Sequence, residues 1–349
     1  MNGSECKMPT EFESTVSASE NAASEAGRAT VLEAHKLVKR YRVGKSTLTA
    51  LDGVSFDLLA GETHGIVGES GCGKSTLAKL LVGLETPDEG AIELQGKPRG
   101  KGRRQFRQSS REIQMVFQDP YTALNPKMTA GDIVREPFEI HPQVVTRSQR
   151  EARIVELFER VGLPAEARHK YPAEFSGGQR QRIGIARALA LDPSVIVCDE
   201  SVAALDVSIQ AQVLNLLNDL KDELGISYVF ISHDLSIMRQ ISDRVSVLYL
   251  GRVVETGSVE DVFERPQHPY TRALLEAVPV PDPEVRTAAA PALQGDVPSP
   301  LDIPSGCAFR TRCPIATERC ATERPELTAR PDSQSRGEVA CHYPLTKPV

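Results

Sequence analysis

Gly68-Glu69-Ser70-Gly71-Cys72-Gly73-Lys74-Ser75 matches the pattern G-x-x-x-x-G-K-[ST] of a phosphate-binding loop. Residues 63–67, which precede it, are predicted to form a short strand, and residues 74–84, which follow it, a helix. The glycines let backbone N–H groups converge on phosphate oxygens, and the helix start adds the positive end of its dipole. The sequence therefore predicts a nucleotide site formed by this loop and Thr76. In it, Lys74 reaches the β- and γ-phosphates and Ser75 binds Mg²⁺.

An acidic pair follows a second apolar segment. Residues 195–198 form a compact apolar run of the kind found in strands buried on both faces, and Asp199 and Glu200 come directly after it. Ligands of open α/β sheets bind at the carboxyl ends of such strands. Two adjacent acids can divide the work there, with Asp199 holding Mg²⁺ through water and Glu200 polarising the attacking water. The alternative is an exposed acidic turn, which the apolar strand disfavours.

Further segments extend the pattern on both sides. Residues 54–58 alternate as a half-buried strand, residues 151–162 and 208–224 place apolar side chains on one helical face, and residues 228–231 form another buried strand. Strands that alternate with helices indicate an α/β fold with a parallel sheet. Residues 1–30 are polar and lack a hydrophobic period, which predicts a disordered tail.

Composition and charge argue against several classes of protein. The 349 residues include 41 Lys+Arg and 47 Asp+Glu, and a net charge of −6 argues against a basic nucleic-acid-binding domain. No run approaches the roughly 18 consecutive apolar residues of a membrane-spanning helix. The N-terminus lacks the basic and apolar regions of a secretory signal, so we expect the protein in the cytosol.

Residues 175–182, Phe-Ser-Gly-Gly-Gln-Arg-Gln-Arg, resemble the signature sequence of ATP-binding cassette (ABC) ATPases, and they lie upstream of the Asp-Glu pair as in that family. Four further positions resemble motifs of the family: Tyr41 the aromatic residue that stacks on adenine, Gln118 the Q-loop, Asp206 the D-loop and His233 the switch histidine. The resemblance implies an α/β, ABC-type P-loop nucleotide-binding domain over residues 31–265. An inserted helical subdomain is expected at about residues 119–188.

The resemblance also implies how the residues share the work. Gln118, Glu200 and His233 are the implied catalytic residues, and Gln118 joins Ser75 at Mg²⁺. In this family two cassettes sandwich two ATP molecules. Each signature therefore contacts the ATP of the opposite subunit, here through Ser176, Gly177, Gly178 and Gln179. Neither site is complete in one chain, which implies a second ABC ATPase subunit as partner, of the same chain or a different one.

Several segments narrow the resemblance to the ATPase subunits of oligopeptide and dipeptide importers: residues 118–126, 268–275, 298–301 and 306–314. This branch carries a C-terminal extension, here residues 266–349. It implies two transmembrane permease subunits, an extracytoplasmic solute-binding protein, a place on the cytoplasmic face of the cell membrane and no nucleic acid. The alternative is a soluble ABC ATPase with a mechanical role on nucleic acid or ribosomes. The second cassette or long coiled-coil insertion usual in such proteins is absent from the sequence.

Four cysteines lie in the small, proline-rich extension: Cys307, Cys313, Cys320 and Cys341. They lack the C-x2-C knuckle that usually marks a structural zinc site. Four thiolates suit either Zn²⁺ or a [4Fe–4S] cluster, and His342 could replace one ligand of zinc. The residues alone do not decide between an iron–sulfur cluster, a zinc ion and no metal. The resemblance to the importer branch, some members of which carry an iron–sulfur cluster there, favours the cluster over zinc.

Overall fold

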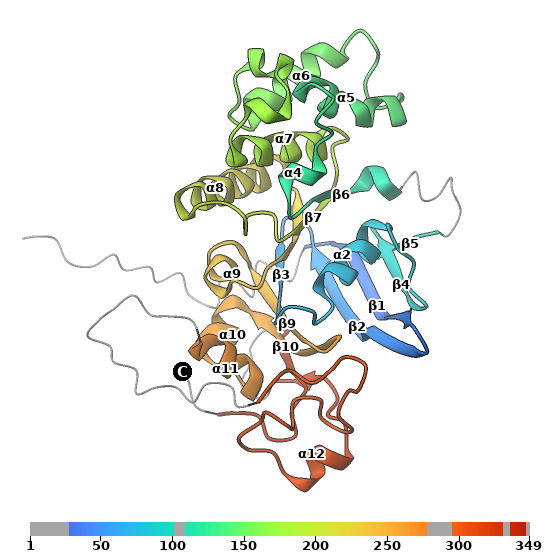
Figure 1. Ribbon diagram of the computed structural model, residues 1–349, viewed down its shortest axis with the longest axis vertical. Helices are drawn as coiled ribbons and strands as arrows, with labels where there is room; N and C mark the ends of the chain where they lie inside the picture. The colour runs from blue at the N-terminus through green and yellow to red at the C-terminus, as the bar shows by residue number, and fades with distance from the viewer. Residues whose placement is uncertain (1–27, 101–108, 278–294, 331–335, 347–349) are drawn as a thin grey trace, which may run out of the picture.

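An eight-stranded sheet forms the centre of the computed structural model, which describes residues 28–100, 109–277, 295–330 and 336–346 (Figure 1). The strand order is β11-β12-β10-β9-β3-β8-β7-β6. Neighbours from β6 to β9 run parallel, and the three strands beyond β9 run antiparallel. The predicted parallel sheet is thereby confirmed. The strands are β3 (Thr63–Val67), β6 (Ile113–Val116), β7 (Val195–Asp199), β8 (Ser227–Ile231), β9 (Arg244–Tyr249), β10 (Arg252–Ser258), β11 (Thr328–Ala329) and β12 (Glu338–Val339).

A second, antiparallel sheet has the order β2-β1-β4-β5. It consists of β1 (Thr30–Val43), β2 (Ser46–Leu59), β4 (Glu89–Leu94) and β5 (Lys97–Pro98). Helix α2 (Lys74–Val82) packs in the apolar core that the antiparallel sheet and the large sheet share. Sequence analysis predicted only residues 54–58 of this sheet. Repeated register shifts along β1 explain the difference, because each shift interrupts the alternation by which a strand is recognised. Of the predicted disordered tail, residues 1–27 lie outside the described residues, and β1 begins at Thr30.

Helices lie beyond the β6 edge and along the sheet (Figure 1). The group beyond β6 forms the helical subdomain: α4 (Pro120–Ala123), α5 (Ala130–Ile140), α6 (Arg150–Arg160), α7 (Gly177–Leu189) and the 3-10 turns η1 (Ala165–His169) and η2 (Pro172–Glu174). Phe138, Leu157 and Phe158 are fully buried among these helices. The helices that follow are α8 (Val207–Leu224), α9 (Leu235–Ile241) and α10 (Val259–Glu264). The predicted helix 151–162 is therefore α6, and the predicted helix 208–224 is α8.

The C-terminal extension shares the sheet and the core of the ATPase region. It contains α11 (Pro269–Glu276), α12 (Glu318–Thr322), β11 and β12, and β12 pairs with β10. Tyr270 and Phe309 are buried in the same apolar core as the strands of the large sheet. Four arginines of the extension pair with acids elsewhere in the chain: Arg312 with Glu69 at 2.8 Å, Arg324 with Asp52 at 3.7 Å, Arg330 with Glu255 at 2.8 Å and Arg336 with Asp57 at 2.9 Å.

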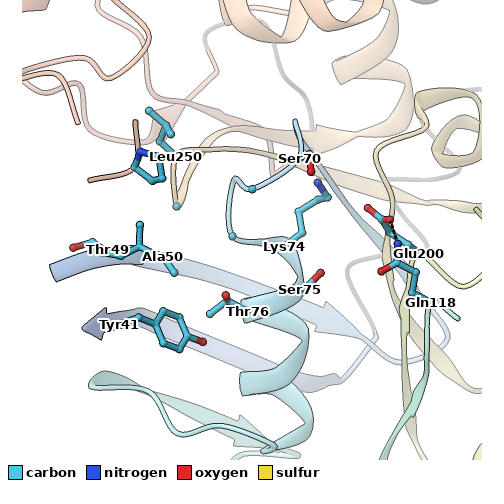
Figure 2. A pocket seen from close by; sticks show the side chains of 15 residues that line it. Tyr41, Thr49, Ala50, Ser70, Lys74, Ser75, Thr76, Gln118, Glu200 and Leu250 are labelled. Carbon is cyan, nitrogen blue, oxygen red and sulfur yellow. Dashed lines mark hydrogen bonds between the residues drawn. The ribbon is translucent and has the colours of Figure 1, made fainter. Parts of the chain in front are cut away.

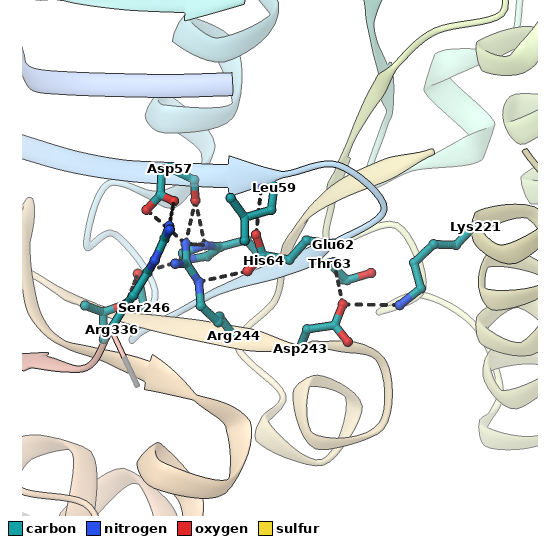
Figure 3. Close-up of polar contacts among 11 residues, drawn as sticks. Asp57, Leu59, Glu62, Thr63, His64, Lys221, Asp243, Arg244, Ser246 and Arg336 are labelled. Carbon is teal, nitrogen blue, oxygen red and sulfur yellow. Dashed lines mark hydrogen bonds and ion pairs between the residues drawn. The ribbon is translucent and has the colours of Figure 1, made fainter. Parts of the chain in front are cut away.

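A largely buried polar network joins β2, β3 and β9 and includes a contact with Arg336 of the extension (Figure 3). Arg244 donates to Asp57 at 3.1 Å, pairs with Glu62 at 2.8 Å and donates to Nδ1 of His64 at 3.1 Å. Burial, reinforced by the positive charge of Arg244, lowers the pKa of His64 to about 3. His64 is therefore neutral, with Nδ1 as acceptor and Nε2–H donating to the Ser246 hydroxyl at 2.8 Å.

Candidate nucleotide site

A pocket of about 300 Å³ lies between the phosphate-binding loop and the antiparallel sheet. Figure 2 shows Lys74, Ser75 and Thr76 on one side of it, and Tyr41, Thr49 and Ala50 on strands of the antiparallel sheet on the other. Most of the lining was predicted from the sequence: Tyr41, Ser70, Gly71, Gly73, Lys74, Ser75, Thr76, Gln118 and Glu200. The other assigned loop residues, Gly68, Glu69 and Cys72, are not part of this lining.

The phosphate-binding loop has the backbone that its glycines permit. Gly73 has φ 110°, and a Cβ there would lie 2.4 Å from the carbonyl oxygen of Ala50, so only glycine fits. The Lys74 ammonium donates to the carbonyl oxygens of Gly68 at 2.8 Å and of Glu69 at 3.0 Å. Helix α2 starts at Lys74, so its free N–H groups face the loop. The arrangement offers several donors to a phosphate group.

The two residues predicted to hold Mg²⁺ on this side lie together. The Ser75 hydroxyl donates to Oδ1 of Asp199 at 3.3 Å, at the carboxyl end of β7. Burial raises the pKa of Asp199, and the hydrogen bond from Ser75 opposes this shift. A hydroxyl and a carboxylate are hard oxygen ligands of the kind that Mg²⁺ takes beside nucleotide phosphates. The residues present therefore fit a Mg²⁺ ion that the nucleotide completes.

The three predicted catalytic side chains form one hydrogen-bonded chain. Gln118 donates from Nε2 to Glu200 Oε2 at 2.7 Å, and His233 Nδ1 lies 3.1 Å from Glu200 Oε1. Glu200 has φ 46°, a left-handed conformation that strains a residue with a side chain. Its backbone N–H is held by the carbonyl oxygen of Ile231 at 2.8 Å. In this backbone conformation the Glu200 carboxylate lies between the side chains of Gln118 and His233.

Tyr41 lies on β1 at the edge of the pocket. Its hydroxyl donates to Glu85, and the Lys39 ammonium lies 5.5 Å from the centre of its ring. Burial and the Glu85 carboxylate raise the pKa of the phenol. The ring is thereby held against the pocket wall, which suits the predicted stacking on a base.

The signature residues lie in the helical subdomain and do not line the pocket among the described residues. Ser176 caps α7, accepting the N–H of Gln179 at 3.3 Å while the Gln179 side chain accepts the N–H of Ser176 at 3.1 Å. A Cβ on Gly178 would lie 2.5 Å from a methyl group of Ile209 in α8, so a glycine is needed for this close packing. Asp206 is exposed at the start of α8. Among the described residues, the start of α7 is therefore not part of the pocket that the chain's own phosphate-binding loop forms.

Part of the pocket wall was not predicted: Leu48, Thr49, Ala50, Leu250, Gly251 and Pro300. Gly251 follows β9 with φ 78°, and its N–H donates to the carbonyl oxygen of Cys72 at 2.8 Å. A glycine two residues after the end of a buried strand was the available signal, because the carboxyl ends of parallel strands share one edge. Pro300 belongs to the extension and carries no such signal.

The four cysteines of the extension have free thiols and line one small pocket with His268 and His342. Burial raises the pKa of Cys307 and Cys313, and that of Cys341 to about 11. Within the described part of the chain, however, no group of three or more histidine, cysteine, aspartate or glutamate side chains is placed so that it could hold a metal ion. The structure therefore does not support the predicted iron–sulfur cluster or its zinc alternative.

Comparisons with known proteins agree with this geometry. Residues 51–203 match the family model of ABC transporters, and residues 254–320 match that of the C-terminal region of oligopeptide/dipeptide transporters. The oligopeptide transport ATP-binding protein OppF of Haemophilus influenzae is 50% identical over 297 residues, which cover 84% of this chain and 89% of that protein. The chain belongs to the ATP-binding proteins of ABC transporters.

Other relatives of this ABC ATPase lead to the same assignment. OppF of Escherichia coli is 50% identical over 84% of this chain and 88% of its own length. A solved dimeric ATP-binding cassette, MJ0796 bound to ADP and Pi, aligns with a TM-score of 0.60 and 29% identity over 65% of this chain and 98% of its own. This chain is therefore an ATPase of the ABC transporter family. None of the helices in the described ranges combines the length and the apolar character needed to cross a membrane.

Proposed function

We propose that this ABC ATPase drives an importer of oligopeptides or dipeptides, docked on two permease subunits at the cytoplasmic face of the membrane. A solute-binding protein would deliver the peptide on the other side. The relatives support the peptide substrate, because OppF is an oligopeptide transport ATP-binding protein that aligns over most of both chains. The match over residues 254–320 supports the same branch. The alternative of a mechanical role on nucleic acid or ribosomes is not favoured by these relatives.

The observation that carries the enzymatic part is the hydrogen-bonded chain from Gln118 through Glu200 to His233 beside Lys74. Bound Mg²⁺ would neutralise charge on the phosphates, held by Ser75 and, through water, Asp199. Glu200 orients and polarises the attacking water, Gln118 completes the metal side, and His233 contacts the γ-phosphate. Lys74 leaves the loop carbonyls for the β- and γ-phosphates. Tyr41 stacks on adenine.

The dimeric arrangement follows from the position of the signature. Ser176 and Gln179 are exposed at its helix start in the helical subdomain, and the cap occupies the N–H of Gln179. The N–H groups of Gly177 and Gly178 would contact a nucleotide on another subunit. The solved cassette with 29% identity is a dimer. Two cassettes would therefore close on two ATP molecules, and hydrolysis would reopen them.

Two substitutions test the assigned roles. Glu200→Gln should abolish steady-state ATP turnover while ATP still binds, because it removes the polarising carboxylate and keeps the phosphate contacts. Lys74→Ala should instead weaken ATP binding itself. Turnover is measured by phosphate release and binding by a fluorescent ATP analogue. Near wild-type turnover of Glu200→Gln would refute the role of Glu200.

Mixed dimers test the sharing of sites between subunits. In a homodimer, a pair of one Lys74→Ala chain and one Ser176→Arg chain has one site with both defects and one with neither. ATPase activity should therefore partly recover on mixing. No recovery despite confirmed mixed dimers would contradict sites shared between identical subunits.

We further propose that Cys307, Cys313, Cys320 and Cys341 hold a [4Fe–4S] cluster when iron and sulfide are supplied. The support is the donor set: four free thiols of the extension on one pocket. Cluster formation would have to draw these thiols closer together than they lie here. Anaerobically purified protein should be brown with about four iron atoms per chain, and serine at any of the four positions should bleach it. Colourless protein with one zinc, or metal-free protein with a protease-resistant extension, would refute the cluster.

A further inference from the structure

Two residues of the C-terminal extension hold Glu69, the second residue of the phosphate-binding loop. Arg312 donates from Nη1 to Glu69 Oε2 at 2.8 Å and from Nη2 to Oε1 at 3.0 Å, a bidentate pair. The backbone N–H of Glu69 donates to the Tyr270 hydroxyl at 3.0 Å. The loop residue is thus held through its side chain and its main chain. In the sequence, Arg312 and Tyr270 stand 243 and 201 residues away from Glu69.

The surroundings make this contact rigid. The Arg312 side chain is only 5% exposed, and its guanidinium lies 6.0 Å from the centre of the Phe309 ring. Phe309 packs on Tyr270 and Tyr249 with ring centres 5.4 and 5.5 Å apart, and Tyr249 and Tyr270 are 4.6 Å apart. Three buried rings, Tyr249 of β9 and Tyr270 and Phe309 of the extension, pack together. They fix the two groups that hold Glu69, the Arg312 guanidinium and the Tyr270 hydroxyl. A bidentate ion pair with little exposure has one geometry and is weakly screened.

The same loop residue also contacts the phosphate-binding lysine. The carbonyl oxygens of Gly68 and Glu69 accept the Lys74 ammonium, so the peptide held by Arg312 and Tyr270 is the one that orients Lys74. The extension also reaches the pocket directly, because Pro300 is part of its lining. A displacement of Glu69 would therefore alter the loop where phosphate binds.

We propose that Arg312 is a positioning residue for ATP binding, which holds the phosphate-binding loop in shape through Glu69 with Tyr270 as its second support. Arg312 does not touch the nucleotide. It restricts the free loop to the conformation that binds ATP. Less conformational entropy is then lost on binding, and the affinity is higher. The inference rests on the proposed function only in requiring that this loop binds ATP.

Arg330 provides the matched control for a purely structural role. It is a second buried arginine of the extension, and it pairs with Glu255 of β10 instead of with the loop. Arg319 provides an exposed control, because it pairs with Glu323 on the surface of α12. Both arginines belong to the extension and neither contacts the nucleotide pocket.

The experiment measures the Kd of a fluorescent ATP analogue, together with KM and kcat of ATP hydrolysis, in full-length chains that remain folded by circular dichroism. Arg312→Ala and Glu69→Ala should each raise Kd and KM about tenfold or more, with kcat changed less than about threefold. Arg312→Lys, which keeps the charge without the bidentate fork, should fall between them and wild type. The double variant Arg312→Ala/Glu69→Ala should be no worse than either single variant, because both remove one contact.

Arg330→Ala should lower the melting temperature but leave Kd unchanged at temperatures where the variant is folded. Arg319→Ala should change neither the melting temperature nor Kd. The proposal is overturned by an unchanged Kd in folded Arg312→Ala, or by an equal rise in Kd for Arg330→Ala. It is also overturned if the two single effects add in the double variant. If Lys74→Ala bound the ATP analogue with the same Kd as wild type, the proposed function itself would be contradicted. That result is distinct from the outcomes above.

Discussion

The helical subdomain and the C-terminal extension are attached beyond opposite edges of the large sheet by different interactions (Figure 1). The subdomain is attached by apolar packing, with Phe138, Leu157 and Phe158 fully buried in a core that continues into the large sheet. Its ion pairs have exposed partners such as Glu151 and Asp192. The extension has only short helices and strands of its own. Besides the buried rings of Tyr270 and Phe309, two buried arginines attach it, Arg312 and Arg330. Arg330 and its partner Glu255 are 2% and 0% exposed.

The difference has a physical consequence. Apolar burial is non-directional, so the subdomain can tolerate small shifts against the sheet. A buried ion pair must keep its geometry, since either charge alone in the interior is costly. Changes in the subdomain should therefore remain local. Loss of a buried arginine of the extension should instead reach the element that carries its partner, which is β10 for Arg330 and the phosphate-binding loop for Arg312. Four predictions test this contrast, from the largest expected effect to the smallest.

Arg330→Ala should lower the free energy of unfolding by about 3–5 kcal/mol, because it leaves Glu255 buried without its cation. Glu255 would retain the backbone N–H groups of Gln267 and His268, at 2.7 and 3.0 Å, but no cation in this contact. Urea unfolding followed by circular dichroism measures the loss. Arg319→Ala on the exposed face of α12 is the control and should unfold as wild type does. A loss under about 1 kcal/mol for Arg330→Ala would contradict the contrast.

Leu157→Ala in the helical subdomain should cost about 3 kcal/mol, since it opens a cavity at a fully buried site. Its effect should remain in the subdomain, with faster amide hydrogen exchange in α5, α6 and α7 and slow exchange retained in β3 and β7. The Kd for ATP should be unchanged in the single chain. A loss of ATP affinity comparable to that of Arg312→Ala would show that the subdomain is coupled to the loop as tightly as the extension.

Acidification should weaken the extension through His268. Burial lowers the pKa of His268 to about 3, so below pH 6.5 the unfolded chain binds a proton that the folded chain does not. Stability is therefore complete above pH 6.5 and falls as the pH drops towards 3, by about 1.4 kcal/mol at pH 5.5 for this group. His268→Asn keeps an acceptor for the N–H of Tyr270 but does not titrate. The melting temperature of this variant should therefore fall less steeply with decreasing pH than that of wild type. If the melting temperature of His268→Asn fell as steeply between pH 7 and 5.5 as that of wild type, the role of His268 in this pH dependence would be contradicted.

Arg135→Ala should have the smallest effect, under about 1 kcal/mol, because the partners Asp132 and Glu151 are exposed. High salt should reduce the difference further, since exposed charges are screened. Thermal unfolding of both proteins at low and high ionic strength measures it. A loss as large as that of Arg330→Ala would remove the distinction between exposed and buried ion pairs.

Local patterns in the sequence were enough for the centre of the nucleotide site. The phosphate-binding loop lies between β3 and α2 as predicted, and Asp199 and Glu200 lie at the end of β7. These features could be read because each depends on residues adjacent in the chain: a glycine spacing, a continuous apolar run or a helical period. The parallel sheet follows from the same runs, since strands buried on both faces, such as β7 and β8, are mainly apolar. The joining of Gln118, Glu200 and His233 was implied by the family resemblance and agrees with the hydrogen bonds found.

Only the tertiary structure determined how the extension meets the ATPase. Glu69 was assigned to the nucleotide, but its carboxylate faces Arg312. Arg312 and Arg330 carry no local signal, because an arginine that will be buried in an ion pair has the same neighbours in the sequence as one on the surface. The partner lies 243 residues away for Arg312 and 75 for Arg330. Spacing rules reach only one turn of helix or one strand, whereas an ion pair depends on where two distant backbones come to lie.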